Sequence, residues 1–408
     1  MPETGRAPGA LAWSGTSDKR SYYRLFSAYV MALVATGVVT VALAIFAFDL
    51  AEDDPSAVIG TALSLKMLAY VIASPVAAAL VERLPRKPLL IALDLVRAAC
   101  LFLLPFVQVV WQVYALVFAF ALASATFTLV YQTVVPYLLG SPEDYSQSLA
   151  RSRIASEVDS SISPLLGAGL LLALSPAGVF VAATLAFVGS AVLVNTADLP
   201  RTTAVLPHGV WGKVLRGPRQ FLARPELRGL LALDVAVALV TAMVMVNTVV
   251  LIEDTLGLQR RATAVAFAVF GLGSIAGALA MPWMLRWLPD RPVMFAGAGL
   301  MVAGMLAGSL VTTSGGLTLV WLVLGLGAAL TLTPASFLIR RIASPADLQT
   351  LFAAQFSISN ACLLVGYSAA GWLGATLGMT ATFLTLAAGA ALATLVAARI
   401  WPREEARG

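Results

Sequence analysis

Residues 29–48 read YVMALVATGVVTVALAIFAF, a run of twenty residues without a charged side chain. About 20 apolar residues in a helix span the hydrocarbon core of a bilayer. Similar runs follow almost to the end of the 408-residue chain, separated by short polar breaks. Only 12% of the residues are charged, whereas a soluble protein carries about 25%. The sequence therefore predicts a chain solvated by lipid.

The apolar runs are continuous rather than alternating, which favours helices over the strands of a membrane barrel. We predict an all-α integral membrane protein with about twelve spanning helices. The expected spans lie near residues 25–50, 57–81, 88–107, 112–137, 150–174, 177–197, 229–252, 262–284, 293–313, 317–337, 349–372 and 377–400.

The basic residues sort by expected topology. If the amino terminus is inside, 22 of the 26 Lys and Arg residues fall on the side of the termini, and only Arg260 and Arg261 fall in loops on the other side. This bias predicts that both termini are cytoplasmic. The net charge of +5 is thereby explained by topology, and we expect no nucleic-acid partner.

The longest polar stretch divides the spans six and six. We expect six-helix bundles at residues 25–197 and 229–400, joined by a cytoplasmic loop at 198–228. Cytoplasmic tails are expected at residues 1–24 and 401–408. An internal repeat supports the division, because several residues recur 204 positions later in equivalent places. The matched residues are Leu84 and Leu288, Pro85 and Pro289, Pro88 and Pro292, and Gly167 and Gly371.

Two parallel six-helix repeats resemble the major facilitator architecture, and so do two motifs. The loop after the second span is similar to the family signature Gly-x-x-x-Asp-Arg-x-Gly-Arg-Arg/Lys, with both glycines replaced. Residues 163–169, SPLLGAG, resemble the Gly-Pro-x-x-Gly-Gly motif of exporters. The resemblance implies a cytoplasmic latch, to which we assign Glu82, Arg83, Arg86, Asp94 and Arg97.

Five further stretches resemble the drug- and metal-efflux branch that contains the NreB-like nickel-resistance exporters. They are KMLAY at 66–70, ALDLVR at 92–97, WQVY at 111–114, DRPVM at 290–294 and LFAAQF at 351–356. The chain departs from this branch at Asn360, where the family has histidine, and in its tail, which is not rich in histidine. Both departures weaken the inference that nickel is the exported substrate.

Ionisable residues within spans are the candidates for coupling, because a charge at the bilayer centre costs about 2.5–3.5 kcal/mol. Lys66 is expected near the midplane, with Glu157 or Asp159 as its counter-charge. A functional role, as a charge relay or as a cation presented to an anionic group of the substrate, and a structural ion pair remain equally open. Asp234, five residues into its expected span, is a further candidate, although its depth also fits a solvated helix end. Asp94 and Arg97 fit the latch better than a substrate site.

Polar side chains in otherwise apolar spans are the candidates for contacting substrate, although hydrogen bonding between helices is the alternative for each. They are Gln132, Asn247, Gln355 and Asn360. His208 is the only histidine and lies in the central loop, and Cys100 and Cys362 lie in different spans. We therefore expect no metal site, no disulfide and no cofactor.

The sequence contains no P-loop, HExxH or GxSxG motif, so we expect a protein that is not an enzyme and that uses an ion gradient. The prediction is a monomeric, proton-coupled exporter of a small organic solute in a bacterial cytoplasmic membrane, with Glu157, Asp159, Asp234 or Asp94 as the proton carrier. The alternative is export of a divalent metal such as nickel or cobalt. A membrane scaffold or membrane-embedded enzyme is the alternative from a different class.

Overall fold

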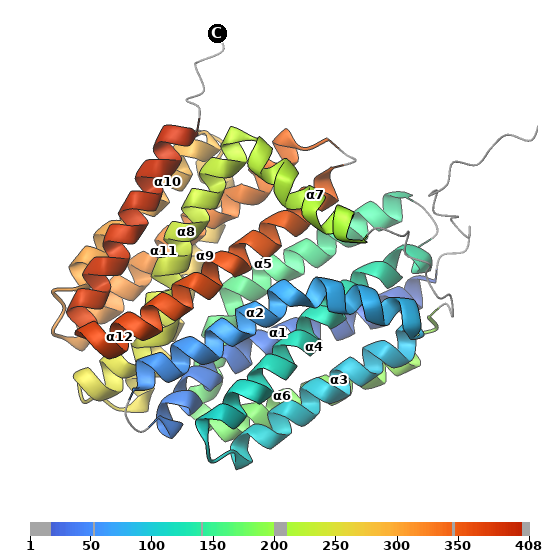
Figure 1. The fold of residues 1–408 in the computed structure, drawn as a ribbon, viewed down its shortest axis with the longest axis horizontal. Coiled ribbons are helices and arrows are strands. Elements are labelled where there is room, and N and C mark those ends of the chain that lie inside the picture. The colour runs from blue at the N-terminus through green and yellow to red at the C-terminus, as the bar shows by residue number, and fades with distance from the viewer. Residues whose placement is uncertain (1–17, 52–53, 140–141, 200–209, 345–346, 402–408) are drawn as a thin grey trace, which may run out of the picture.

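The computed structural model describes residues 18–51, 54–139, 142–199, 210–344 and 347–401, and these ranges consist of helices joined by short turns (Figure 1). Within these ranges the structure describes the backbone of every helix but not every side chain. The predicted site residues whose side chains it does not describe are Glu82, Arg83, Glu157 and Asp159.

Six helices form the amino-terminal half. They are α1 (Lys19–Leu50), α2 (Pro55–Arg83), α3 (Arg86–Leu103), α4 (Val110–Leu138), α5 (Pro142–Ala173) and α6 (Pro176–Thr196), with a 3-10 turn η1 (Leu104–Phe106) after α3. The remaining helices are α7 (Val210–Ala223), α8 (Pro225–Val249), the π-helical turn η2 (Val250–Thr255), α9 (Arg260–Met284), α10 (Asp290–Gly308), α11 (Ser314–Ile342) and α12 (Leu348–Ile400).

Local sequence explains where several helices begin and where one is broken. Asp18 caps α1, because its carboxylate accepts a hydrogen bond from the backbone N–H of Ser21. This hydrogen bonding lowers the pKa of Asp18. Proline, which suits the first turn of a helix, begins α2, α5, α6 and α8. Gly378 has a φ of +75°, which breaks α12.

The break in α12 makes it two spans. Its 53 residues would extend about 80 Å at the usual rise, whereas the hydrocarbon core is about 30 Å thick. Ten of the described helices are long and apolar enough to cross a membrane. Counting α12 twice and adding α5 brings the total to twelve, which confirms the predicted all-α membrane fold.

The central stretch between the halves holds a helix that the sequence analysis did not predict. α7 lies within the expected loop 198–228, and it packs against α12. The contact is close, because a Cβ added at Gly217 would lie 3.1 Å from the carbonyl oxygen of Thr350. Short helices that gain their stability from one packed face carry too few apolar residues to be recognised by span length.

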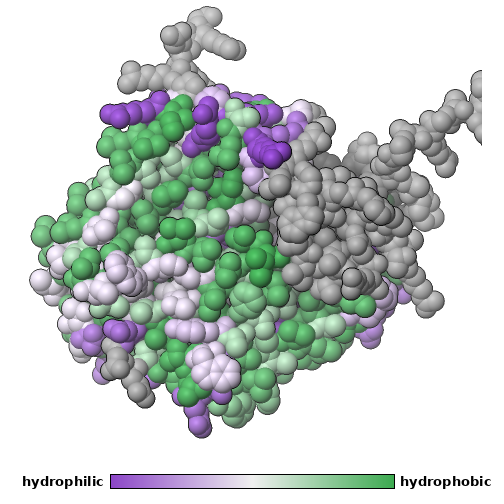
Figure 2. All heavy atoms as spheres, in the orientation of Figure 1, coloured by the Kyte–Doolittle hydropathy of each residue, from purple (hydrophilic) through white to green (hydrophobic). Residues whose placement is uncertain are grey.

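The two halves meet mainly through α2 against α12 and α5 against α9 (Figure 1). We call the end of the bundle at which α1 begins and α12 ends the termini end, and the opposite end, at which α1 ends and α2 begins, the distal end. The viewed surface is mainly apolar along the flank, and hydrophilic residues gather toward the ends (Figure 2). This distribution is typical of a bundle surrounded by lipid. Which end faces the cytoplasm stays a prediction.

Candidate functional site

Lys66 is a buried cation inside the amino-terminal half. Its side chain leaves α2 and donates a hydrogen bond to the hydroxyl of Thr40 on α1, and the residue is only 8% exposed. The ammonium nitrogen lies 6.0 Å from the ring centre of Tyr70, one turn further along α2. A small apolar cavity between α1, α2, α3 and α4 borders the side chain. The predicted counter-charges, Glu157 and Asp159, lie outside the described residues, so this pairing stays a prediction.

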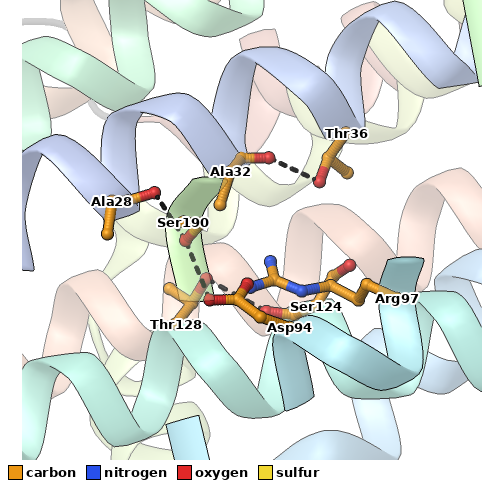
Figure 3. Close-up of polar contacts among 8 residues, drawn as sticks. All are labelled: Ala28, Ala32, Thr36, Asp94, Arg97, Ser124, Thr128 and Ser190. Atoms are coloured by element: carbon orange, nitrogen blue, oxygen red, sulfur yellow. Dashed lines mark hydrogen bonds and ion pairs between the residues drawn. The ribbon is translucent and has the colours of Figure 1, made fainter. Parts of the chain in front are cut away.

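A second charged group fills the centre of the same half (Figure 3). Arg97 and Asp94 of α3 form an ion pair, and both residues are almost fully buried. Ser190 of α6 donates to the other carboxylate oxygen of Asp94 at 2.8 Å. The guanidinium carbon of Arg97 lies 4.2 Å from the ring centre of Phe127 and 4.5 Å from that of Phe187. The cation–π contacts join α3 to α4 and α6, and the hydrogen bond from Ser190 joins α6 to α3 a second time.

This placement bears on the predicted latch. Asp94 lies eight residues after the start of α3 at Arg86, which corresponds to about 12 Å along the helix. The pair therefore faces the interior of the bundle rather than the loop after α2. Arg86 itself is buried, whereas Glu82 and Arg83 lie outside the described residues. A latch role for these residues stays a prediction.

The carboxyl-terminal half contains a buried acid without a described cationic partner. Asp234 of α8 is 3% exposed, and it accepts a 2.7 Å hydrogen bond from the side-chain nitrogen of Gln355 on α12. The same nitrogen also contacts the hydroxyl of Ser359 at 3.1 Å. No ion pair to Asp234 is formed by the Lys and Arg side chains that the structure describes. Asp234 Oδ1 and Gln355 Oε1 have no hydrogen-bond partner among the described residues.

The burial of Asp234 corrects the depth expected from the sequence. α8 begins at Pro225 rather than at residue 229, so Asp234 lies nine residues, or about 14 Å, along the helix. Asp234 therefore does not lie at a solvated helix end, as its expected depth had allowed. Residues 225–228 are polar apart from Pro225 and Leu227, so the sequence does not separate this first turn of α8 from the central loop.

The other candidate substrate contacts are not gathered into one place. Asn247 is fully buried, and its amide donates to the carbonyl oxygen of Ala370, which joins α8 to α12. Asn360 donates to the carbonyl oxygen of Phe356 within its own helix. Gln132 is exposed on α4. Among the described side chains, Gln355 is the one candidate of the four that contacts a buried ionisable group.

An aromatic pair links the two halves beside these charges. The rings of Tyr70 on α2 and Phe356 on α12 stack at a centroid distance of 6.3 Å and an angle of 23°. Tyr70 is one turn from Lys66, and Phe356 follows Gln355 directly. One ring of the pair is therefore close to the buried cation of the amino-terminal half, and the other follows the residue that contacts the buried acid of the carboxyl-terminal half. Sequence reasoning missed it, because aromatic residues in apolar spans give no signal that separates an interface from ordinary packing.

A set of contacts closes the distal end. Arg260, at the start of α9, forms an ion pair with Asp49, at the end of α1, and its Nε lies 3.9 Å from a carboxylate oxygen of Glu253. Close by, α2 and α12 cross at glycines: a Cβ added at Gly60 would lie 2.6 Å from the Cα of Gly371. Charge and close backbone contact thus join the halves at this end.

Within the described residues, no group of three or more His, Cys, Asp and Glu side chains is placed to hold a metal ion. The chemistry that the described groups offer is therefore proton binding at a buried carboxyl, fixed positive charge at Lys66, and apolar contact at the aromatic pair.

Known proteins share this architecture. The family described as Major Facilitator Superfamily matches residues 25–291 and 230–408, and no curated protein matches the chain. The nucleoside transporter NupG is similar in structure, with 12% identity and a TM-score of 0.71 over 94% of this chain and 100% of that chain. A POT family transporter in complex with a thioalcohol-conjugated peptide has 12% identity and a TM-score of 0.72 over 96% and 100%.

A bacterial homolog of the human lysosomal transporter Spinster, in an inward-facing and unoccupied conformation, has 15% identity and a TM-score of 0.65 over 96% of this chain and 98% of that chain. At such identities the likeness shows the fold alone, and the family match covers nearly all of the sequence. The family match shows that the chain belongs to the Major Facilitator Superfamily and is a multi-pass membrane transporter, not an enzyme.

Proposed function

We propose that the protein is a proton-coupled exporter of a small organic solute, and that it works by rocking residues 1–197 against residues 229–408. The observation that carries the proposal is the buried carboxyl of Asp234, which is held by Gln355. The direction of transport rests on the exporter-like stretch SPLLGAG at residues 163–169.

A carboxyl group in this position suits reversible proton binding. An ionised acid in apolar surroundings is costly without a cation, and uptake of a proton removes the charge. Gln355 is able to serve both forms, because its NH₂ group donates to the carboxylate and its oxygen, after rotation of the amide, accepts from the protonated acid. Because Gln355 belongs to α12, which contacts the other half, protonation of Asp234 is connected to the interface that moves in the proposed cycle.

The surroundings favour an organic solute over a metal ion. The aromatic pair Tyr70 and Phe356 lies at the interface of the halves, and Phe356 is 51% exposed. Exposed aromatic surface at a moving interface offers contact to apolar groups of a solute. Leu165, within the SPLLGAG stretch, packs against Gly271 of α9, so the exporter-like stretch also lies at this interface. No described group favours a metal over an organic solute.

The test of coupling uses the protein in liposomes with a fluorescent amphiphilic dye and an imposed pH gradient. Asp234→Asn keeps the size of the side chain and its contact with Gln355 but removes the titrating group. We expect it to abolish concentrative dye transport and to retain exchange of dye across the membrane, whereas Asp234→Glu retains some coupling. The matched control is Asp54→Asn, at an exposed position just before α2, which is expected to transport normally. Concentrative transport at the wild-type rate by Asp234→Asn would refute the assigned role.

The substrate is tested in efflux-deficient cells by measuring the accumulation of the dye and of radioactive nickel, with and without the protein. Lower dye accumulation supports the proposal, and dissipation of the proton gradient by an uncoupler is expected to abolish the effect. Lower nickel accumulation with unchanged dye would reject the organic solute in favour of the metal alternative.

A further inference from the structure

A groove lies between α2 and α12, the two helices that run side by side on the viewed face in Figure 1. Its volume is about 230 Å³, and its lining includes Thr61, Ser64 and Leu68 of α2 and Leu364, Ser368 and Trp372 of α12. One wall therefore comes from each half of the transporter. The groove lies in the distal half of the bundle, because α2 begins at Pro55 and α12 reaches its distal break at Gly378.

The groove opens toward the surface that faces lipid. Its rim carries exposed apolar side chains, with Leu68 37% and Trp372 65% exposed, and Val365 beside it is 65% exposed. None of the residues lining the groove is charged. The surrounding flank of the bundle is mainly apolar (Figure 2). In a bilayer, this opening meets hydrocarbon rather than water.

The polar groups on the floor of the groove are engaged with each other. The hydroxyls of Ser64 and Ser368 lie 2.9 Å apart and bridge the two halves. Ser64 also approaches the carbonyl oxygen of Leu364 at 3.4 Å, and Ser368 donates to the same carbonyl oxygen at 2.9 Å. A ligand in the groove therefore needs no polar group to satisfy the floor, and an apolar chain fits it better than a polar head.

The length of the groove matches one leaflet of a membrane. From Ala57 to Leu68, its lining covers eleven residue steps of α2, which is about 16 Å. One leaflet contributes about 15 Å, half of the hydrocarbon core. The extent of the lining along α2 is therefore comparable with the length of an acyl chain in one leaflet.

We propose that this groove binds one acyl chain of a phospholipid from the leaflet at the distal end. The chain lies against both halves, with its methylene groups on Leu68, Leu364 and Trp372 and over the paired serines. This inference goes beyond the proposed export function, and no proton gradient is needed to test it.

The experiment titrates detergent-solubilised full-length protein with a phospholipid that carries bromine atoms midway along its acyl chains, and it follows the quenching of tryptophan fluorescence. The signal of Trp372 is the difference between the wild type and Trp372→Phe, because the chain has 8 tryptophans. We expect the quenching of this signal to saturate at about one lipid per protein molecule. Saturation is expected at a lower lipid concentration than the general binding of lipid to the apolar flank.

Two kinds of variant separate filling of the groove from loss of its hydrogen bonds. Ala57→Leu and Ser368→Leu fill the groove and are expected to abolish the saturating phase. Ser368→Ala removes the hydroxyl and leaves the groove open, and Val365→Leu adds bulk beside it; both are expected to keep that phase. Size-exclusion profile and helical content are measured for each variant. If the leucines at positions 57 and 368 prevent folding, Ser368→Ala and Val365→Leu still test the proposal, because both are required to keep the saturating phase.

Three results would overturn the proposal. The first is quenching of Trp372 that rises with lipid without saturating, which means general coating by lipid. The second is an unchanged saturating phase in Ala57→Leu and Ser368→Leu. The third is displacement of the brominated lipid by the transported dye at the dye's own transport affinity, which would assign the groove to the solute.

Discussion

The close crossing of α2 and α12 leads to a prediction about which state of the transporter this structure represents. At Gly60 an added Cβ would lie 2.6 Å from the Cα of Gly371 and 2.8 Å from the carbonyl oxygen of Tyr367. Both are backbone atoms, so no change of rotamer relieves the clash. Gly60→Ala should therefore destabilise the arrangement in which the distal ends of the halves touch.

The size of the effect follows from the kind of clash. Overpacking of this sort costs about 1–3 kcal/mol, and a penalty confined to one of two conformations shifts their equilibrium by about 5- to 150-fold. Alanine also favours a helix over glycine by about 1 kcal/mol, but this gain is common to both conformations and cancels. The variant is expected to fold and to populate a conformation that is open at the distal end.

The assay measures the distance between spin labels at Asp54→Cys and Thr376→Cys, two exposed positions at the distal end, in a background that lacks the native cysteines Cys100 and Cys362. Gly60→Ala is expected to add a longer distance component. The matched control is Gly299→Ala on α10, where an added Cβ meets no atom within 4 Å. An unchanged distance distribution in Gly60→Ala would refute the reasoning that this crossing closes the distal end.

Three further predictions concern the buried and bridging charges. Lys66→Ala is expected to lose most transport while the amount of inserted protein stays unchanged, and a wild-type transport rate would reject a mechanistic role for the cation. Arg97→Met leaves the Asp94 carboxylate uncompensated in the bundle and is expected to destabilise the protein by about 3–5 kcal/mol, as measured by thermal unfolding in detergent; an unchanged melting temperature contradicts this. A double-mutant cycle on Asp49→Ala and Arg260→Ala is expected to give a coupling of about 0.2–1 kcal/mol that weakens with salt, because both side chains are partly exposed; a coupling that salt does not change would show that the pair is not a screened surface contact.

The class of the protein and the number of its spans were predictable because both depend on local properties. A run such as residues 29–48 requires a lipid environment wherever it sits in the fold, and short polar breaks mark the ends of each span. The expected break between residues 372 and 377 lies just before Gly378, whose positive φ divides α12. The boundaries were less accurate where a helix continues past the bilayer, as at α5, which begins at Pro142 instead of residue 150.

The candidate residues were recognisable as costly groups, but their surroundings were not. Lys66 and Asp234 stood out because each places a charge in an apolar run. That Lys66 contacts Thr40, and that Asp234 contacts Gln355, depends on how helices distant in sequence face each other. The same is true of Arg97, whose position between the rings of Phe127 and Phe187 brings together three helices.

A membrane-embedded bundle of about twelve helices in two halves follows from the amino-acid sequence alone, because the cost of exposing polar backbone and charge to lipid acts on each segment separately. The partners of the buried charges, the places where the halves touch, and the groove between α2 and α12 depend on how the helices pack. Those features arise from helix crossings, and the crossings depend on small residues such as Gly60 and Gly371 whose contacts are with residues hundreds of positions away.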